Sequence, residues 1–192
     1  MTEKLLTIPR DSILYVAARL MKSNKVGSLL VQKGKDFVGI ITETDIVQKA
    51  IAVNLPSDTA RVSEVMTSPL LTIEADCSIL EAADLMTEQR VRHLAVTEKR
   101  KIIGIISIRD ILKSEELPWI SISRLMSSTV FLVTRGANIT EAAKLMRYNR
   151  IRSLLVAGRR QRPRTEPFLV GTGTAIIGIL TATDIIRKIA AE

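Results

Sequence analysis

Three short segments of the chain share a pattern of residues suited to holding a phosphorylated sugar. Each segment reads glycine, two apolar residues, a hydroxyl residue, two variable residues and an aspartate. A Ser or Thr that opens a helix leaves free N–H groups, which attract phosphate. An aspartate one turn later can accept hydrogen bonds from both hydroxyls of a ribose, and the glycine removes a side chain where a ligand could approach. The resulting phosphate candidates are Thr42, Ser107 and Thr181, and the ribose candidates are Asp45, Asp110 and Asp184.

The same spacing has an interpretation that needs no ligand. A Ser or Thr followed three residues later by an acid forms a capping box, in which the two side chains satisfy the first N–H groups of a helix. For one copy alone this interpretation is the stronger. Capping boxes prefer the longer Glu or Gln, however, and all three segments here use Asp. The repeated Asp favours a ligand.

The chain lacks the residues that catalysis and metal binding commonly need. The chain has one histidine and one cysteine, Cys77. A Ser/His/Asp or Cys/His set, a phosphate loop of the Walker type or a cysteine–histidine metal cluster cannot be assembled from them. We therefore expect a protein that is not an enzyme, with no catalytic cofactor and no metal site.

The segments that position these residues form three repeats. Gly39 and Gly104 are 65 positions apart, as are Asp45 and Asp110, while Met86 and Met146 are 60 apart. Within each copy, apolar spacing changes from helical to strand-like and back, so each copy reads strand, helix, strand, strand, helix. The third copy carries 14 extra residues before Gly178. We predict an α/β chain with repeats at 1–54, 62–115 and 122–192, the last with a basic insertion near 158–174.

On these residues the unit resembles a CBS (cystathionine-β-synthase) domain, repeated over nearly the whole chain. The resemblance implies that repeats 1 and 2 pair about a pseudo-twofold axis, as a Bateman module, with clefts that bind AMP, ADP, ATP or another adenosine ligand such as S-adenosylmethionine. It also implies phosphate-contacting cations before the first hairpin strand, where Arg can grip phosphate with two hydrogen bonds. The implied phosphate ligands are Arg92, His93, Arg109 and Arg152, and the implied adenine-pocket residues are Leu5, Leu70 and Val130.

Structural alternatives remain for these residues too. Arg92 and Arg152 fit a solvated strand entrance equally well, and His93 fits a packed imidazole. Leu5, Leu70 and Val130 fit an ordinary core. The first repeat has Gly27 and Ser28 where the second has cations, and it lacks the lead-in that precedes the others.

Charge and the odd number of repeats indicate the partners. A net charge of +8 favours polyanions, and the arginines between Arg159 and Arg164 in the insertion suggest nucleic acid or an acidic protein as an alternative partner. Aromatic residues make up only 3% of the chain, too few for a base-stacking platform. The third repeat has no partner if repeats 1 and 2 pair, which predicts a homodimer through repeat 3.

The sequence thus predicts a regulatory sensor that binds an adenine nucleotide and signals to an unknown regulated protein by a changed orientation of its repeats. No apolar run approaches the roughly eighteen residues of a membrane span, and the first residues do not resemble a secretory signal, so we expect no membrane and a cytoplasmic location. A scaffold with empty clefts, serving only dimerisation, is a further alternative.

Overall fold

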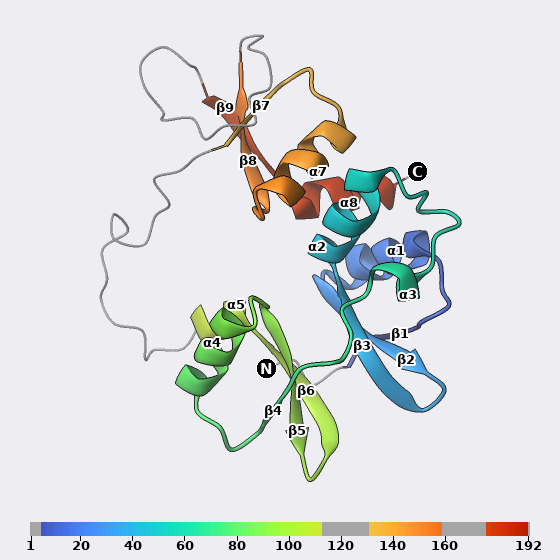
Figure 1. Cartoon of the computed structure of the whole chain (residues 1–192), viewed down its shortest axis with the longest axis vertical. Coiled ribbons are helices and arrows are strands. Elements are labelled where there is room, and N and C mark those ends of the chain that lie inside the picture. Colours follow the sequence, from blue (N-terminus) through green and yellow to red (C-terminus); the bar gives the residue numbers. More distant parts are fainter. Residues whose placement is uncertain (1–4, 113–130, 159–175, 192) are drawn as a thin grey trace.

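The computed structural model describes residues 5–112, 131–158 and 176–191. Within these ranges the chain forms three small three-stranded sheets, each with its own helices (Figure 1). The predicted order of strand, helix, strand, strand, helix is confirmed in all three repeats.

The elements have the following bounds. Repeat 1 contains β1 (Thr7–Pro9), α1 (Leu14–Asn24), β2 (Ser28–Lys33), β3 (Asp36–Thr42), α2 (Glu43–Asp45), the π-helical turn η1 (Ile46–Ala50) and the 3₁₀ turn η2 (Ile51–Val53). The short helix α3 (Val62–Val65) begins the range of repeat 2. Repeat 2 contains β4 (Thr72–Glu74), α4 (Ile79–Glu88), β5 (His93–Glu98), β6 (Lys101–Ser107) and α5 (Ile108–Leu112). Repeat 3 contains β7 (Leu132–Thr134), α7 (Ile139–Tyr148), β8 (Ser153–Ala157), β9 (Ile176–Thr181) and α8 (Ala182–Ile189).

The three sheets share one topology and one register. In each sheet a short first strand pairs in parallel with the middle strand, which pairs in antiparallel fashion with the third. The middle strand shows a register shift at the same place in every repeat, after Val31, Val96 and Val156. Capping boxes at Ser78/Glu81 and Asn138/Glu141 start α4 and α7. Similar sequences have therefore produced similar local structures, down to the irregularity.

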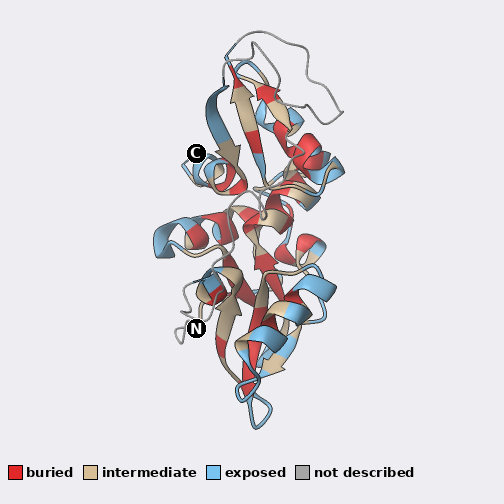
Figure 2. Ribbon diagram, turned by 90° about the vertical axis from the view of Figure 1, so that its left-hand side faces the viewer, coloured by how far each residue is buried: buried red, intermediate tan, exposed pale blue. Residues whose placement is uncertain are grey.

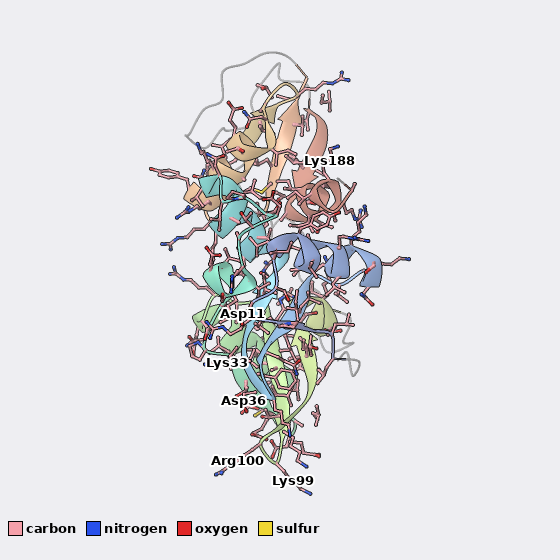
Figure 3. All side chains as sticks on the ribbon, turned by 90° about the vertical axis from the view of Figure 1, so that its right-hand side faces the viewer. Asp11, Lys33, Asp36, Lys99, Arg100 and Lys188 are labelled. Carbon is pink, nitrogen blue, oxygen red and sulfur yellow. The ribbon has the colours of Figure 1, made fainter. Side chains whose placement is uncertain are left out.

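Repeats 1 and 2 cover each other's sheets. The two sheets lie next to each other at one end of the molecule, and their hairpin tips, marked by Lys33 and Asp36 on one and Lys99 and Arg100 on the other, point the same way (Figures 1 and 3). Leu29, Leu30 and Val31 are consecutive in β2, yet all are fully buried, as expected of a strand covered on both faces.

The edge of β3 is closed by the segment that leads into repeat 2. The N–H of Ile40 donates to the carbonyl of Thr67 at 3.0 Å, and the N–H of Thr67 donates to the carbonyl of Ile40 at 2.8 Å. The predicted pairing of repeats 1 and 2 is confirmed.

Repeat 3 packs its helices on those of repeat 1. One apolar core contains Leu14 and Met21 of repeat 1 together with Ala143, Met146 and Ile185 of repeat 3. The sequence predicts that repeat 3 has no partner inside the chain, and for its helices that prediction is wrong. Both repeats present amphipathic helices, and burying the apolar stripes against each other stabilises them.

The sheet of repeat 3, in contrast, is open on one face among the described residues. Figure 2 shows β9 exposed at the far end of the molecule from the paired sheets. Ile177 and Ile179 are 52% and 58% exposed. Most of the third-repeat insertion predicted near 158–174 lies outside the described residues.

Within the described ranges, no helix combines the length and the apolar character that crossing a membrane requires.

Candidate ligand clefts

Two clefts lie where repeats 1 and 2 meet. Cleft A has a volume of about 270 Å³ and cleft B about 310 Å³. Both are near the lower end of the range of roughly 300–1,000 Å³ that is typical of small-molecule pockets. The lining of cleft A includes Leu6, Lys25, Gly27, Ser28, Glu43, Thr44, Arg92, His93, Ser107, Arg109, Asp110 and Arg152. The lining of cleft B includes Thr42, Thr44, Asp45, Lys49, Thr67, Leu70, Leu71, Arg90, Arg92 and His93.

The two clefts are related by exchange of the repeats. Many residues that line one cleft have their equivalents, 65 positions away, lining the other, as the pairs Leu6/Leu71, Lys25/Arg90, Ser28/His93, Thr42/Ser107 and Asp45/Asp110 show. This exchange is what a pseudo-twofold axis between repeats 1 and 2 produces. In each repeat the segment from the glycine to the aspartate, residues 39–45, 104–110 and 178–184, joins the last strand to the following helix and is called the corner below. Each cleft combines the corner of one repeat with the start of the middle strand of the other.

The corners themselves are closed capping boxes. In repeat 1 the Thr42 hydroxyl donates to Asp45 Oδ2 at 2.6 Å, and the Thr42 N–H donates to the same oxygen at 2.9 Å. Ser107 and Asp110 make the same pair of hydrogen bonds at 2.7 and 2.8 Å, and so do Thr181 and Asp184 at 2.6 and 2.9 Å. The inference that Asp disfavours a capping box is therefore wrong, because its short side chain reaches the cap in every repeat.

Cleft A draws its positive charges from all three repeats. Its cations are Lys25 of repeat 1, Arg92 and Arg109 of repeat 2, and Arg152 of repeat 3. Burial lowers the pKa of Arg152 from its ordinary value, and the nearby Glu43 carboxylate acts in the opposite direction. A guanidinium held in a partly desolvated cleft attracts an anionic ligand more strongly than one in water.

Thr44 connects the three repeats at this cleft. Its hydroxyl oxygen accepts hydrogen bonds from Arg92 Nη2 at 2.8 Å and from Arg152 Nε at 3.0 Å. The neighbouring Glu43 is buried, and its carboxylate accepts a hydrogen bond from the Thr183 hydroxyl at 2.7 Å. One corner of repeat 1 thus holds side chains from both other repeats.

Comparison with known families assigns the repeats. The model of the CBS domain matches residues 1–51, 62–116 and 122–191. The chain belongs to the CBS domain family.

Relatives of the chain carry the same domain. It is 34% identical over 109 residues to the mitochondrial CBS domain-containing protein CBSX3 of Arabidopsis thaliana, covering 54% of this chain and 53% of that protein. It is 26% identical over 219 residues to CBSCBSPB3 of the same plant, covering 98% of this chain and 39% of that protein. The chain thus spans about half or less of the length of these two relatives.

Solved structures agree with the fold. Protein MJ1225 of Methanocaldococcus jannaschii, which is proposed to be an archaeal homolog of g-AMPK, superposes with a TM-score of 0.74 at 23% identity over 97% of this chain and 69% of that one. A protein with CBS domains from Burkholderia ambifaria MC40-6, proposed to act in signal transduction, gives a TM-score of 0.57 at 38% identity over 62% of this chain and 90% of that one.

His93, at the start of β5, lines both clefts between CBS repeats 1 and 2. Burial lowers its pKa from the ordinary value of 6.5, and the charge of Arg109 lowers it further, whereas Asp110 and Asp45 act in the opposite direction. The imidazole is therefore held mainly neutral at pH 7. A phosphate bound beside it would favour the protonated form.

The structure brings together most of the predicted site residues, but not all. Thr181 and Asp184 of the third CBS repeat line neither cleft, and Asp184 is exposed. Leu70 lines cleft B, while Leu6 rather than the predicted Leu5 is among the residues that line cleft A. Val130 lies outside the described residues.

Several residues that line the clefts were not predicted from the sequence. Lys25 and Arg90 line clefts A and B, and both follow the first helix of their repeat with a left-handed backbone, at φ of 56° and 54°. Arg150 has the same position and φ in repeat 3. The sequence does show a cation after the first helix of each repeat, and this recurrence could have indicated a ligand site. A helix C-terminus also favours a cation when no ligand binds, so the recurrence alone does not decide. No pattern shared by the three repeats indicated the other cleft residues, Lys49, Thr44 and Thr67.

The glycine of the first corner makes room for a neighbouring backbone. A Cβ placed on Gly39 would lie 2.4 Å from the carbonyl oxygen of Thr67, whereas one on Gly178 would meet nothing within 4 Å. Gly39 therefore makes room for the backbone that closes the edge of β3. Across the described ranges no three His, Cys, Asp or Glu side chains gather where they could hold a metal ion.

Proposed function

We propose that the chain is a regulatory sensor that binds an adenine nucleotide in cleft A. The observation that carries this proposal is the convergence of Lys25, Arg92, Arg109 and Arg152 from three repeats on one cleft that also contains the Ser107–Asp110 corner. The arginines supply donors for phosphate oxygens, and the corner carboxylate supplies an acceptor for ribose hydroxyls. Catalysis has no part in this role.

The cations favour a ligand with phosphates. AMP, ADP and ATP carry negative charge to the arginines, whereas S-adenosylmethionine offers no phosphate and brings a sulfonium cation. Among adenosine ligands we therefore expect the nucleotides to bind more tightly than S-adenosylmethionine.

Signalling follows from the position of Thr44. A phosphate in cleft A competes with the Thr44 hydroxyl for Arg92 and Arg152, and those two hydrogen bonds link repeat 1 to repeats 2 and 3. Charge-assisted hydrogen bonds to phosphate are stronger than those to a neutral hydroxyl. Binding thereby changes which repeat orientation is favoured, and a partner protein reads that orientation.

The test is thermal unfolding with AMP, ADP, ATP or S-adenosylmethionine. A ligand that binds only the folded protein stabilises it by about 2.7 kcal/mol at a hundredfold excess over its Kd. We expect Asp110→Ala to abolish the shift. Asp184→Ala is the matched control, since it removes the same kind of helix cap in a repeat whose corner lines neither cleft.

Other outcomes point elsewhere. No shift with any adenosine ligand would contradict the sensor, and a salt-sensitive shift with a long RNA alone would favour the arginines at 159–164, which lie outside the described residues. Loss of the shift in Asp184→Ala alone would move the site to repeat 3.

We further propose that two copies meet through the open sheet of repeat 3. Leu155 and Ile179 are register partners there, as Leu30 and Ile40 are in repeat 1. Repeat 2 covers the face of Leu30 and Ile40, which are 0% and 7% exposed, so a second repeat 3 fits the equivalent face. Such a contact is isologous and closes as a dimer.

Light scattering coupled to size-exclusion chromatography tests the dimer. Ile179→Lys places a charge on the proposed contact and should yield monomers. Leu80→Lys, at a side chain 72% exposed on α4, should leave the dimer intact. A monomeric wild type, or a dimeric Ile179→Lys variant, would exclude this contact.

A further inference from the structure

Asp45, the corner carboxylate of cleft B, is engaged on both oxygens. Its Oδ2 accepts hydrogen bonds from the Thr42 N–H and hydroxyl at 2.9 and 2.6 Å. Its Oδ1 accepts the Thr67 hydroxyl at 3.0 Å and lies 2.7 Å from the ammonium of Lys49. The Lys49 ammonium also donates to the Thr67 hydroxyl at 3.1 Å, so Lys49, Thr67 and Asp45 form a closed triangle.

A carboxylate has acceptor sites for about four hydrogen bonds. The four donors around Asp45 fill them. A ribose that enters cleft B must displace Lys49 or Thr67 before either of its hydroxyls can bind this carboxylate. Displacing Lys49 would also exchange an ammonium–carboxylate pair, charged on both sides, for a weaker hydrogen bond from an uncharged hydroxyl.

We propose that Lys49 is a specificity-determining residue that closes cleft B to ribose, so that the repeat 1–2 pair takes its nucleotide in cleft A alone. This inference rests on the proposed function of cleft A. It assigns different tasks to two clefts of similar volume: cleft A receives the ligand, and cleft B is closed by a side chain of the chain itself.

The sequence supports a difference between the clefts. Lys49 follows Asp45 by four positions, and the residue four positions after Asp110 is Ser114, which carries no charge. The third repeat has Lys188 at the equivalent position. Lys49 is 46% exposed and Asp45 only 9%, so the lysine can be changed without opening the core, while the carboxylate that it covers stays inside the cleft.

Isothermal titration of the full chain with ATP tests the inference. The wild type should bind one equivalent at the repeat 1–2 pair, and that equivalent should be lost in Asp110→Ala and kept in Asp45→Ala. Lys49→Met keeps an unbranched side chain one atom shorter and removes its charge, and it should gain one further equivalent. The gain should disappear in the double variant Lys49→Met/Asp45→Ala. Lys188→Met is the matched control and should leave the stoichiometry of the wild type.

The two proposals fail in different ways. If the wild type binds an equivalent that Asp45→Ala removes, or if Lys49→Met binds ATP with unchanged stoichiometry, the closure of cleft B is wrong and the sensor function stands. If neither the wild type nor Lys49→Met binds ATP, ADP or AMP while circular dichroism shows both folded, the sensor function is wrong and the closure of cleft B fails with it.

Discussion

Repeats 1 and 3 have the same sheet, with the same register, and differ in what covers it. Ile40 is 7% exposed and Ile179 is 58% exposed, although each pairs with a leucine of the neighbouring strand in the same way. The two repeats share one apolar core through their helices. The repeat unit therefore has two apolar faces, one on its helices and one on its sheet. Among the described residues, the helix face is covered in both repeats, whereas the sheet face is covered only in repeat 1.

This difference shows that the clefts belong to the sheet face. Both lie where repeats 1 and 2 meet, whereas the corner of repeat 3, although its capping box is complete, lines neither. A corner alone is a helix cap, and among the described residues it lines a cleft only where a second sheet faces it.

The largest effect is expected from a charge on the covered face. Ile40→Lys should lower the free energy of unfolding by about 3 kcal/mol, because a charge that must lose its water replaces a buried apolar side chain. Ile179→Lys should change it by less than about 0.5 kcal/mol in the monomer, as exposed substitutions do. Urea unfolding measures both, and equal losses would show that the two faces are covered alike.

The glycines give the next largest contrast. Gly39→Ala should cost about 1–3 kcal/mol, since its Cβ would force the Thr67 carbonyl away from the edge of β3. Gly178→Ala should be neutral or stabilise by about 0.4–1 kcal/mol, because the space is open and alanine restricts the unfolded chain. Chemical unfolding of the pair provides the measurement, and a tolerated Gly39→Ala would contradict the close approach.

A smaller effect is expected from His93, which stands where repeats 1 and 3 have Ser28 and Ser153. Its pKa is lowered in the folded protein by burial, so below about pH 6.5 the unfolded chain binds more protons than the folded one. Stability should therefore fall as the pH drops below 6.5, down to the folded pKa. His93→Ser should make the melting temperature less dependent on pH between 7 and 5, and an unchanged dependence would exclude this origin.

The smallest effect concerns the exposed corner of repeat 3. The hydrogen bond from the Thr181 hydroxyl lowers the pKa of Asp184 from its ordinary value of 3.8. Stability from this bond is present above that value and is lost as the pH falls through the folded pKa, although solvent screening keeps it small. Thr181→Val should flatten the acid end of the stability profile, and titration of the Asp184 carboxyl by NMR should show its pKa rising.

Much of the fold was predictable from the sequence because local signals repeat. Helix caps such as Ser78 and Asn138 and the glycine-led corners recur at fixed spacing, so each copy supports the interpretation of the others. The pairing of repeats 1 and 2 followed from the family resemblance. The docking of repeat 3 on repeat 1 did not, because an apolar helix stripe does not identify the helix that it packs against.

The candidate site was predictable in its residue types and less so in its assembly. Arg92, His93, Arg109 and Asp110 were expected at the site and do line cleft A. Arg152 was expected too, but nothing in the spacing of repeat 3 indicated that its guanidinium would reach a cleft between the other two repeats. Lys49 was missed because a lysine one turn after an aspartate is common on solvated helices, and only the position of Thr67 gives it a further partner.

The contact of Arg152 with Thr44 also bears on how the protein is made. The two residues are 108 positions apart, so they meet only after most of the chain has left the ribosome. Repeats 1 and 2 can close their sheets during synthesis, since domains generally fold as units from the N-terminus. The last cation of cleft A arrives only when repeat 3 folds and docks. A chain that has not yet folded its third repeat therefore forms the cleft between repeats 1 and 2 without the guanidinium of Arg152.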